Sequence, residues 1–237
     1  MTSPHQNDHF PVIELLRYTI SPGARANVAR RFDDTLAHAF QHLGGMAFGH
    51  FCERGRPDGF AWLRGFRTRT ACARIGRAFD EQAHSADGFI RTEALLLKPL
   101  HPDTGIAPLP MGGDAQGIVV AQLFQVAPGR MDACERAAER CFAAYHGRGV
   151  IEAGILATLG ERAAGAALVW LGILSDDAAL AALRPAFDAA AGELARAAML
   201  AAPPELLVLD PGRRSRLRWV SAASVTAPAR SATMAAA

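Results

Sequence analysis

The chain has 237 residues, half of them hydrophobic, and its 25 basic and 23 acidic side chains leave a formal net charge of +2. This length allows one or two domains with a real core, and the balanced charge argues against a nucleic-acid surface, which needs clustered basic residues. The polar start "MTSPHQNDHF" does not resemble a signal peptide, and no window reaches the roughly 18 apolar residues of a membrane helix. We therefore expect a cytoplasmic protein.

The first half of the chain predicts the order strand, helix, strand, strand, helix, strand. The opening strand is rich in β-branched and apolar residues and ends before a Pro-Gly turn, and apolar residues then recur every four positions, as in a helix. The predicted strands are 12–20, about 46–52, 60–66 and 93–99, and the first helix carries Val28, Phe32, Leu36 and Phe40.

The second half predicts the same order. A strand at 118–126 again ends before Pro-Gly, and a helical pattern covers about 131–145. The later strands are predicted at about 150–156, 166–174 and 205–211, with a second helix before the last of them.

The two halves also repeat each other in sequence. Residues 60–80 align with 168–188 without a gap, which places Trp62 on Trp170 and Asp80 on Asp188. Upstream, "YTISPG" matches "FQVAPG" at a spacing of 106, and downstream "EALLLKP" matches "ELLVLDP" at a spacing of 112. Small changes in spacing indicate insertions in loops, where they are tolerated.

The repeated order β-α-β-β-α-β is that of the ferredoxin-like unit. Such a unit has helices on one face of its sheet, and exposing the other face would cost about 25 cal/mol per Å² of apolar surface. We therefore predict an α+β fold with two tandem ferredoxin-like units packed sheet to sheet as an intramolecular α/β-barrel. We expect domains at 10–104 and 115–212, with flexible tails at 1–9 and 213–237.

The stretches "ELLRYTISPG", "GHFCERGRPDGFAWLRGF" and "ALLLKP" resemble the first half of the NIPSNAP proteins, which belong to the dimeric α/β-barrel superfamily. The resemblance is strongest from Val12 to Phe66. It departs from the family at Leu16, where an arginine is usual, because the neighbouring Arg17 must point to the opposite face of its strand. The resemblance implies the fold and little about the chemistry, since one fold hosts many activities.

Strand alternation predicts which side chains line the barrel. We place the aromatic and arginine face of strand 60–66 towards the barrel interior, together with the faces of the neighbouring strands that match it. The expected lining is Glu14, Tyr18, His50, Phe60, Trp62 and Arg64 from the first half, and Gln122, Phe124 and Trp170 from the second.

These residues suggest a small-molecule site that is polar on one side and apolar on the other. Arg64 would hold an oxyanion and His50 or Tyr18 would move a proton, as the catalytic residues, while Trp62 and Phe124 stack on the substrate. Each residue also has a structural interpretation. The aromatic rings and His50 could be core, and Arg64 could pair with Glu14.

We expect no cofactor and no bound metal. His38 and His42 have the i, i+4 spacing of metal ligands, but no third ligand accompanies them. Some branches of the superfamily hold haem through a histidine, and His146 would be the candidate in this chain.

Two functions follow from these features. The first is an enzyme or binding protein for a small apolar or aromatic molecule, and the resemblance implies chemistry like that of a cofactor-independent monooxygenase, isomerase or cyclase. The second is a non-catalytic scaffold that binds a protein partner through its outer helices. We expect no nucleic-acid or membrane partner, and the fold allows a further homodimer.

Overall fold

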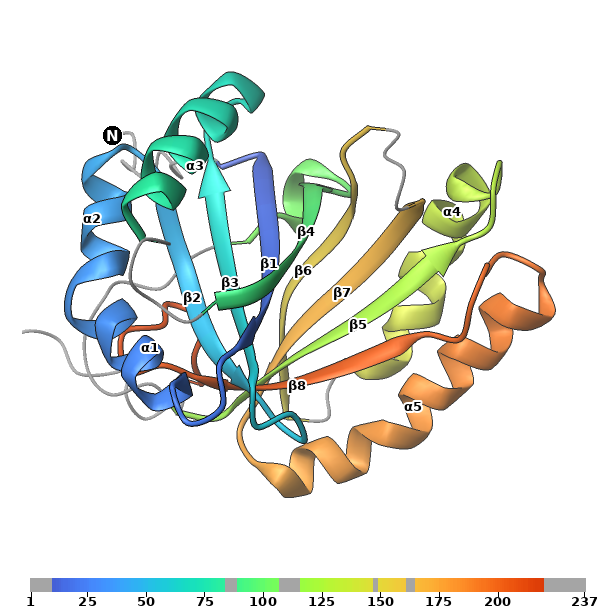
Figure 1. Ribbon diagram of the computed structural model, residues 1–237. Coiled ribbons are helices and arrows are strands. Elements are labelled where there is room, and N and C mark those ends of the chain that lie inside the picture. The colour runs from blue at the N-terminus through green and yellow to red at the C-terminus, as the bar shows by residue number, and fades with distance from the viewer. Residues whose placement is uncertain (1–9, 84–88, 107–115, 147–148, 161–164, 220–237) are drawn as a thin grey trace, which may run out of the picture.

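A computed structural model describes residues 10–83, 89–106, 116–146, 149–160 and 165–219 (Figure 1). Within them the predicted order β-α-β-β-α-β occurs twice. The strands are β1 Val12–Ile20, β2 Met46–Glu53, β3 Gly59–Phe66, β4 Phe89–Pro99, β5 Ile118–Val126, β6 Val150–Thr158, β7 Ala166–Leu174 and β8 Glu205–Pro211. The helices are α1 Arg25–Arg31, α2 Ala37–His42, α3 Arg69–Ala83, α4 Met131–Phe142 and α5 Asp177–Arg196, and a π-helical turn, Phe32–Leu36, joins α1 to α2.

The eight strands form a closed barrel in the order β1-β3-β2-β8-β5-β7-β6-β4. Each half contributes a four-stranded antiparallel sheet, and the two sheets meet along β2–β8 and β4–β6. Each meeting line has only three paired positions, such as Glu53 with Leu209 and Leu97 with Thr158. The predicted fold class is confirmed.

The helices of each half cover the outer face of that half's own sheet (Figure 1). The barrel interior is a third apolar cluster, to which both halves contribute, with Ile13 and Leu63 packed in the same core as Val119 and Leu171. Each half thus removes the inner face of the other from water, as the repeat predicted.

A β-bulge occurs at the same place in both halves. The register of β2 with β3 shifts between Ala47 and Gly49, and that of β6 with β7 shifts between Glu152 and Gly154. The extra residue reverses the alternation of side chains along the strand. As a result Phe48 packs inside the barrel, whereas His50 stacks on Phe60 under the helices. Alternation without the bulge would place these two side chains on one face.

Residues 212–219, which we call the C-terminal strap, pack along β2. The backbone N–H groups of Arg216 and Leu217 donate to the carbonyl oxygen of Phe48, and that of Trp219 donates to the carbonyl oxygen of Gln116. Leu217 is 2% exposed and belongs to the barrel core. The sequence predicted a flexible tail from residue 213, whereas Ser215 and Leu217 within it are buried; residues 1–9 and 220–237 lie outside the described residues.

Over the part of the chain that the structure describes, no helix combines the length and the apolar character needed to cross a membrane.

We expect Leu217→Ala to lower the free energy of unfolding by about 2 to 4 kcal/mol, because it leaves a cavity in the barrel core. The exposed strap residue Arg213 provides the control, and Arg213→Ala should stay within about 0.5 kcal/mol of the natural chain. Urea unfolding followed by tryptophan fluorescence measures both. Equal stability of all three proteins would show that the strap does not complete the core.

Candidate functional site at the barrel mouth

The nine predicted site residues face the helices and not the barrel interior. Tyr18, Phe60 and Trp62 belong to the core beneath α1 to α3, and Phe124 and Trp170 belong to the core beneath α4 and α5. The assignment of this face to the interior was therefore wrong. The residues that face inward from β3 are the smaller ones, Ala61, Leu63 and Gly65.

Arg64 is the centre of a buried ionic cluster. Its Nε donates to Glu14 Oε2 at 2.7 Å, and Nη1 donates to Asp80 Oδ1 at 3.0 Å. Its guanidinium carbon lies 4.9 Å from the centre of the Trp62 ring, a cation–π contact. Burial tends to lower the pKa of Arg64, but Glu14 and Asp80 raise it above its ordinary value. The predicted pairing of Arg64 with Glu14 is present.

A shallow depression of about 550 Å³ lies beside this cluster, over α3. Glu14, Arg64, Asp80 and Gly76 border it, and a Cβ on Gly76 would come within 3.3 Å of Arg64 Nη2. The Arg64 side chain is only 3% exposed and is already bound by two carboxylates. An oxyanion would therefore have to displace Glu14 or Asp80 to reach it.

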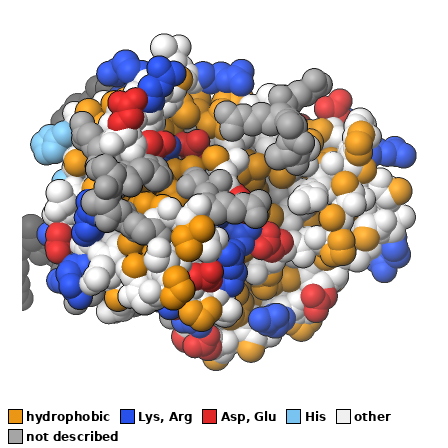
Figure 2. Space-filling model, in the orientation of Figure 1, with side chains coloured by type: hydrophobic (Ala, Val, Ile, Leu, Met, Phe, Trp, Pro, Cys, Tyr) orange, Lys and Arg blue, Asp and Glu red, His pale blue; other side chains and the backbone are white. Residues whose placement is uncertain are grey.

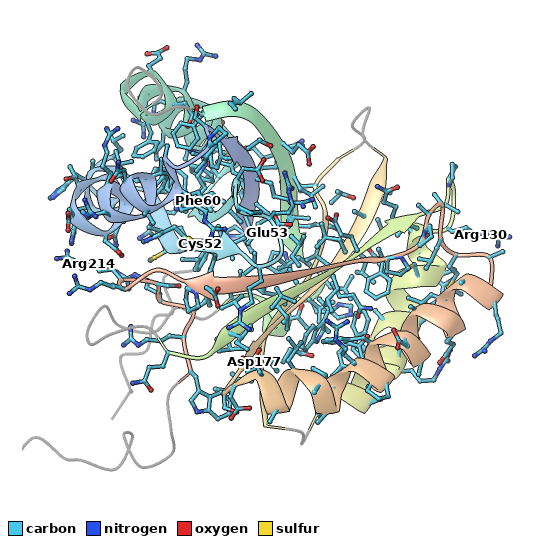
Figure 3. The ribbon with its side chains drawn as sticks, turned by 60° about the horizontal axis from the view of Figure 1, so that its bottom comes forward. Cys52, Glu53, Phe60, Arg130, Asp177 and Arg214 are labelled. Carbon is cyan, nitrogen blue, oxygen red and sulfur yellow. The ribbon has the colours of Figure 1, made fainter. Side chains whose placement is uncertain are left out.

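His50 lies against Asp33 and the C-terminal strap. Its Nε2 is 3.1 Å from Asp33 Oδ1. Asp33 also accepts from the backbone N–H of Arg214, which lies beside the helices of the first half (Figure 3). A Cβ on Gly212 would fall 1.9 Å from His50 Nε2, so only glycine fits there. These contacts make His50 an anchor for the strap.

The predicted ligand-binding residues of the second half also have structural partners. Gln122 Oε1 accepts from the Tyr145 hydroxyl at 2.6 Å, and its amide donates to the carbonyl oxygen of Phe187. The Trp170 Nε1 donates to Glu152 Oε2 at 2.9 Å. The Trp170 ring lies over Gly172, where a Cβ would come within 2.1 Å of it. Gly172 thus makes room for the ring at the position that Arg64 holds in the first half.

Tyr18, Phe60 and Phe124 pack as core aromatic residues. The Tyr18 ring lies 4.5 Å from that of Phe89, and the Phe124 ring lies 5.5 Å from that of Phe142. Phe60 is fully buried and contacts Phe32. Burial raises the pKa of the Tyr18 hydroxyl well above its ordinary value, which disfavours an ionised Tyr18 at neutral pH.

The histidines considered for metal or haem binding do not converge. His146 is exposed, and its Nε2 lies 3.3 Å from Glu152 Oε2. His38 contacts the Arg214 side chain, and His42 is exposed on the last turn of α2. Among the described residues no group of three or more His, Cys, Asp or Glu side chains could hold a metal ion.

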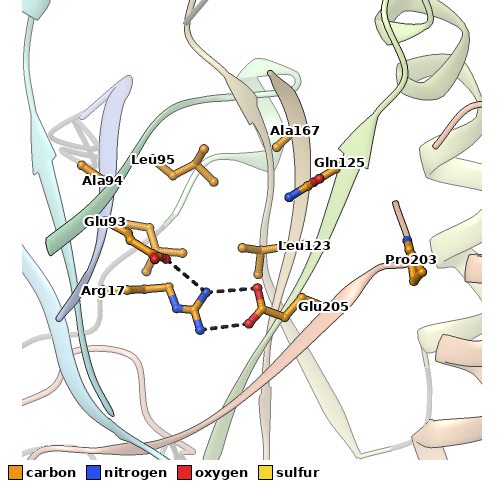
Figure 4. Close-up of a pocket in the computed structure, with 10 residues that line it drawn as sticks. Arg17, Glu93, Ala94, Leu95, Leu123, Gln125, Ala167, Pro203 and Glu205 are labelled. Atoms are coloured by element: carbon orange, nitrogen blue, oxygen red, sulfur yellow. Dashed lines mark hydrogen bonds and ion pairs between the residues drawn. The ribbon is translucent and has the colours of Figure 1, made fainter. Parts of the chain in front are cut away.

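A pocket of about 410 Å³ opens at one end of the barrel, between the two sheets (Figure 4). We call it the mouth pocket. It lies at the end of the barrel where the two sheets are no longer paired. There β4 extends beyond the last paired residue of β6, and β8 extends beyond the last paired residue of β2. Its wall is mainly apolar and its rim carries charged side chains. The lining residues are Leu15, Arg17, Glu93, Ala94, Leu95, Leu123, Gln125, Ala167, Pro203 and Glu205.

Arg17 connects the two halves across this rim. It donates to both carboxylate oxygens of Glu205, at 2.9 and 3.0 Å, and to Glu53 Oε1 at 3.1 Å. Its Nη1 also lies 3.8 Å from Glu93 Oε2. Figure 2 shows basic and acidic side chains next to one another near the centre of this face, with hydrophobic atoms around them. Burial tends to lower the pKa of Arg17, but Glu205 and Glu53 raise it above its ordinary value.

Two sequence signals could have identified the mouth pocket. Arg17 alternates with Leu16 and Tyr18, so placing those two under the helices would have turned Arg17 inward. Glu93 and Glu205 begin the matching stretches "EALLLKP" and "ELLVLDP", which predicts equivalent places in the two halves. Because the opposite face of these strands was predicted to line the barrel interior, neither signal pointed to a pocket.

No family model matches the sequence, and no curated protein matches it. Solved structures do match the fold. A protein from Lactobacillus acidophilus NCFM, provisionally assigned as a monooxygenase, superposes with a TM-score of 0.60 at 11% identity over 90% of this chain and all of its own. One from Fusobacterium nucleatum with the same assignment gives 0.62 at 8% identity, over 90% of this chain and 99% of its own.

An anthrone oxidase-like protein gives a TM-score of 0.58 at 14% identity and covers 86% of this chain and 92% of its own. At these identities the matches concern the fold alone. Together with the closed barrel of two ferredoxin-like units, they show that this chain has the dimeric α/β-barrel fold.

We expect Arg64→Met to lower the free energy of unfolding by about 3 to 5 kcal/mol, because it leaves the buried Glu14 carboxylate without its partner. Adding Glu14→Gln should restore part of this loss. Arg74→Met on the exposed face of α3 is the matched control. Chemical unfolding of the natural chain, Arg64→Met, Glu14→Gln, the double variant and Arg74→Met measures the coupling between Arg64 and Glu14, and a loss at Arg74 as large as that at Arg64 would contradict the assignment.

The Asp33 contacts predict a dependence of stability on pH. Burial would raise the pKa of Asp33, but His50 and the backbone N–H groups of Arg214 and Arg213 lower it below its ordinary value. A lowered pKa contributes stability that is present above the unfolded pKa of about 4 and is lost as the pH falls below it. Asp33→Asn should therefore be less stable at neutral pH and lose less stability on acidification.

Urea unfolding from neutral pH to about pH 3 measures this difference, with the exposed neighbour Asp34→Asn as the control. Because the Asp34 side chain is exposed, the Asp34 variant should stay within about 0.5 kcal/mol of the natural chain at neutral pH. Parallel curves for the natural chain and Asp33→Asn would exclude the Asp33 contacts as a source of acid sensitivity.

Proposed function

We propose that the protein binds a small apolar or aromatic molecule in the mouth pocket. The observation that carries this proposal is a pocket of about 410 Å³ whose apolar wall meets a rim of convergent charged side chains. Pockets of this size and character are typical of small-molecule sites. Leu15, Leu95 and Leu123 would contact the body of the ligand, and Arg17, Glu93 and Glu205 would contact its polar end.

The rest of the barrel supports the mouth as the place for a ligand. The interior beyond the pocket is filled by the protein's own side chains, among them Phe48, Phe51 and Leu171, which are at most 3% exposed. At the mouth, Ala94 and Ala167 are small, and Leu123 is shorter than the arginine that occupies the equivalent place in the first half. Small side chains at this end keep the space open.

The fold and the stretches that resemble NIPSNAP proteins support membership of that family as a further proposal. Two solved structures with this fold carry a provisional monooxygenase assignment, and a third is called anthrone oxidase-like. These names support turnover of a monooxygenase or isomerase type as a proposal for the same ligand class. Proton transfer by His50 or Tyr18 stays a prediction, since the described contacts of both rings are those of packed residues.

The scaffold alternative needs an exposed apolar face on the helices. Among the described residues the exposed large hydrophobic side chains are Ile90 and Ile151, and both lie on strands. The observations therefore favour the small-molecule proposal.

We expect a subset of hydroxylated naphthalenes and quinones to raise the unfolding temperature in a thermal-shift screen, because a ligand that binds the folded state stabilises it. Leu95→Trp should fill the pocket and weaken binding of the best compound at least about tenfold. Ile90→Trp is the matched control, since Ile90 lies on the same strand, is 65% exposed and does not line the pocket. Unchanged affinity of Leu95→Trp would remove the mouth pocket as the binding site.

A further inference from the structure

Gln125 is the uncharged polar side chain among the residues that line the mouth pocket. In Figure 4 its amide points from β5 towards the middle of the pocket. The side chain is exposed at this end of the strand, and the half-buried Leu123, two residues earlier, shares its face. A neutral hydrogen-bonding group therefore stands directly above part of the apolar wall.

The backbone around Gln125 is fixed from both sides. Gln125 is paired with Ala167 on β7, and its carbonyl oxygen accepts from the N–H of Ala201 at 2.8 Å. Just beyond the strand, the N–H of Ala127 donates to the carbonyl oxygen of Met199, also at 2.8 Å. A side chain that starts from such a rigid element keeps its place relative to the pocket, as a ligand-binding group must.

The Gln125 amide has no partner within the part of the chain that the structure describes. Comparable polar side chains do have partners. Gln122, on the opposite face of β5, forms hydrogen bonds at both ends of its amide. Thr19, the residue equivalent to Gln125 in the first half, accepts from Arg56 at 3.3 Å. The polar group that faces the pocket is thus the one that the chain leaves to water or to a ligand.

The charged groups of the rim bind mainly one another. Arg17 donates to both carboxylate oxygens of Glu205 and to Glu53, and it stands 3.8 Å from Glu93. A charged ligand would have to compete with these contacts, since the rim already holds both signs of charge. A neutral polar group on the ligand can instead bind Gln125 and leave the ionic contacts in place.

We propose that the mouth pocket selects neutral aromatic molecules whose edge carries an N–H donor next to a carbonyl acceptor, as in a cyclic amide, and that Gln125 binds both groups. A carboxamide matches such an edge, because its oxygen accepts and its nitrogen donates side by side. The inference rests on the proposed function and names the ligand class and the residue that recognises it. The ring would lie on Leu95 and Leu123.

Ligands without this edge should bind less well for a physical reason. They would displace water from the Gln125 amide without replacing its hydrogen bonds, and an unpaired polar group lowers affinity. Gln125 would therefore determine specificity, whereas the leucines would supply the contact area that all ligands share.

The test compares three bicyclic probes of nearly one shape. 2-Quinolone carries an N–H beside a carbonyl, quinoline keeps only an acceptor, and naphthalene has neither group. Titration calorimetry at about pH 8, where all three are neutral, should give 2-quinolone an affinity about tenfold above that of naphthalene, with quinoline between them. The order should persist at high salt, because no ionic contact produces it.

Two variants locate the recognition at Gln125. Gln125→Leu should weaken 2-quinolone about tenfold and leave naphthalene within about threefold of its original affinity. Gln125→Glu keeps the size of the side chain but removes the amide donor, so it should also lose the preference for 2-quinolone. Gln116→Leu is the matched control, since Gln116 is exposed at the opposite end of β5 and does not line the pocket. Far-UV circular dichroism and thermal unfolding check that each variant is folded.

The outcomes separate the two proposals. Equal affinity for the three probes, a Gln125→Leu variant that still prefers 2-quinolone, or an equal loss of preference in Gln116→Leu would each overturn the inference and leave a small-molecule pocket in place. Failure of all three probes to bind, naphthalene included, would overturn the proposed function and the inference with it.

Discussion

The constraint that shapes this molecule is that each four-stranded sheet has two apolar faces and helices for only one of them. The second sheet supplies the missing cover, and the inner faces merge into one core that contains residues from both halves. Closure needs few hydrogen bonds between the sheets, since each line of contact has three paired positions. The apolar interior therefore holds the halves together more than the strand pairing does.

Short lines of contact also explain where a ligand can enter. A barrel paired along its whole length would leave no opening between the sheets, and its interior would be filled with side chains. Here the ends of β4 and β8 diverge from the other half at the mouth, and Arg17 spans the gap with ionic contacts to Glu205 and Glu93 (Figure 4). The C-terminal strap contributes Leu217 to the same interior core. Among the described residues, the mouth pocket is therefore the opening through which a ligand would enter the barrel.

The two halves share a frame and differ in its chemistry. Arg64 and Glu14 of the first half are replaced by Gly172 and Val120 in the second, where Asp188 keeps the aspartate of position 80 and the Trp170 ring fills the space. Arg17 is likewise replaced by Leu123. A homodimer of identical units would carry each feature twice, whereas a single chain with two different halves can carry a feature in one half and use the equivalent position differently in the other. The asymmetry of the mouth pocket arises in this way.

The sequence by itself determined the order of elements, the occurrence of this order in both halves and the closed barrel. Local periodicity and turn residues define the strands and helices, and the repeat shows that two open faces are available to each other. Individual cross-strand features were also within its reach, such as the matched glutamates at positions 93 and 205.

Only the tertiary structure decided which face of each sheet points inward. Strands β1 and β3 are apolar on both faces, so alternation separates two sets of side chains without saying which one is inside. The barrel interior is narrow and takes Ala61 and Gly65, whereas the wider space under the helices takes Trp62, Phe66 and the buried Arg64. The bulge at Ala47 to Gly49 and the packing of the C-terminal strap also depend on contacts between distant residues, which local sequence patterns do not contain.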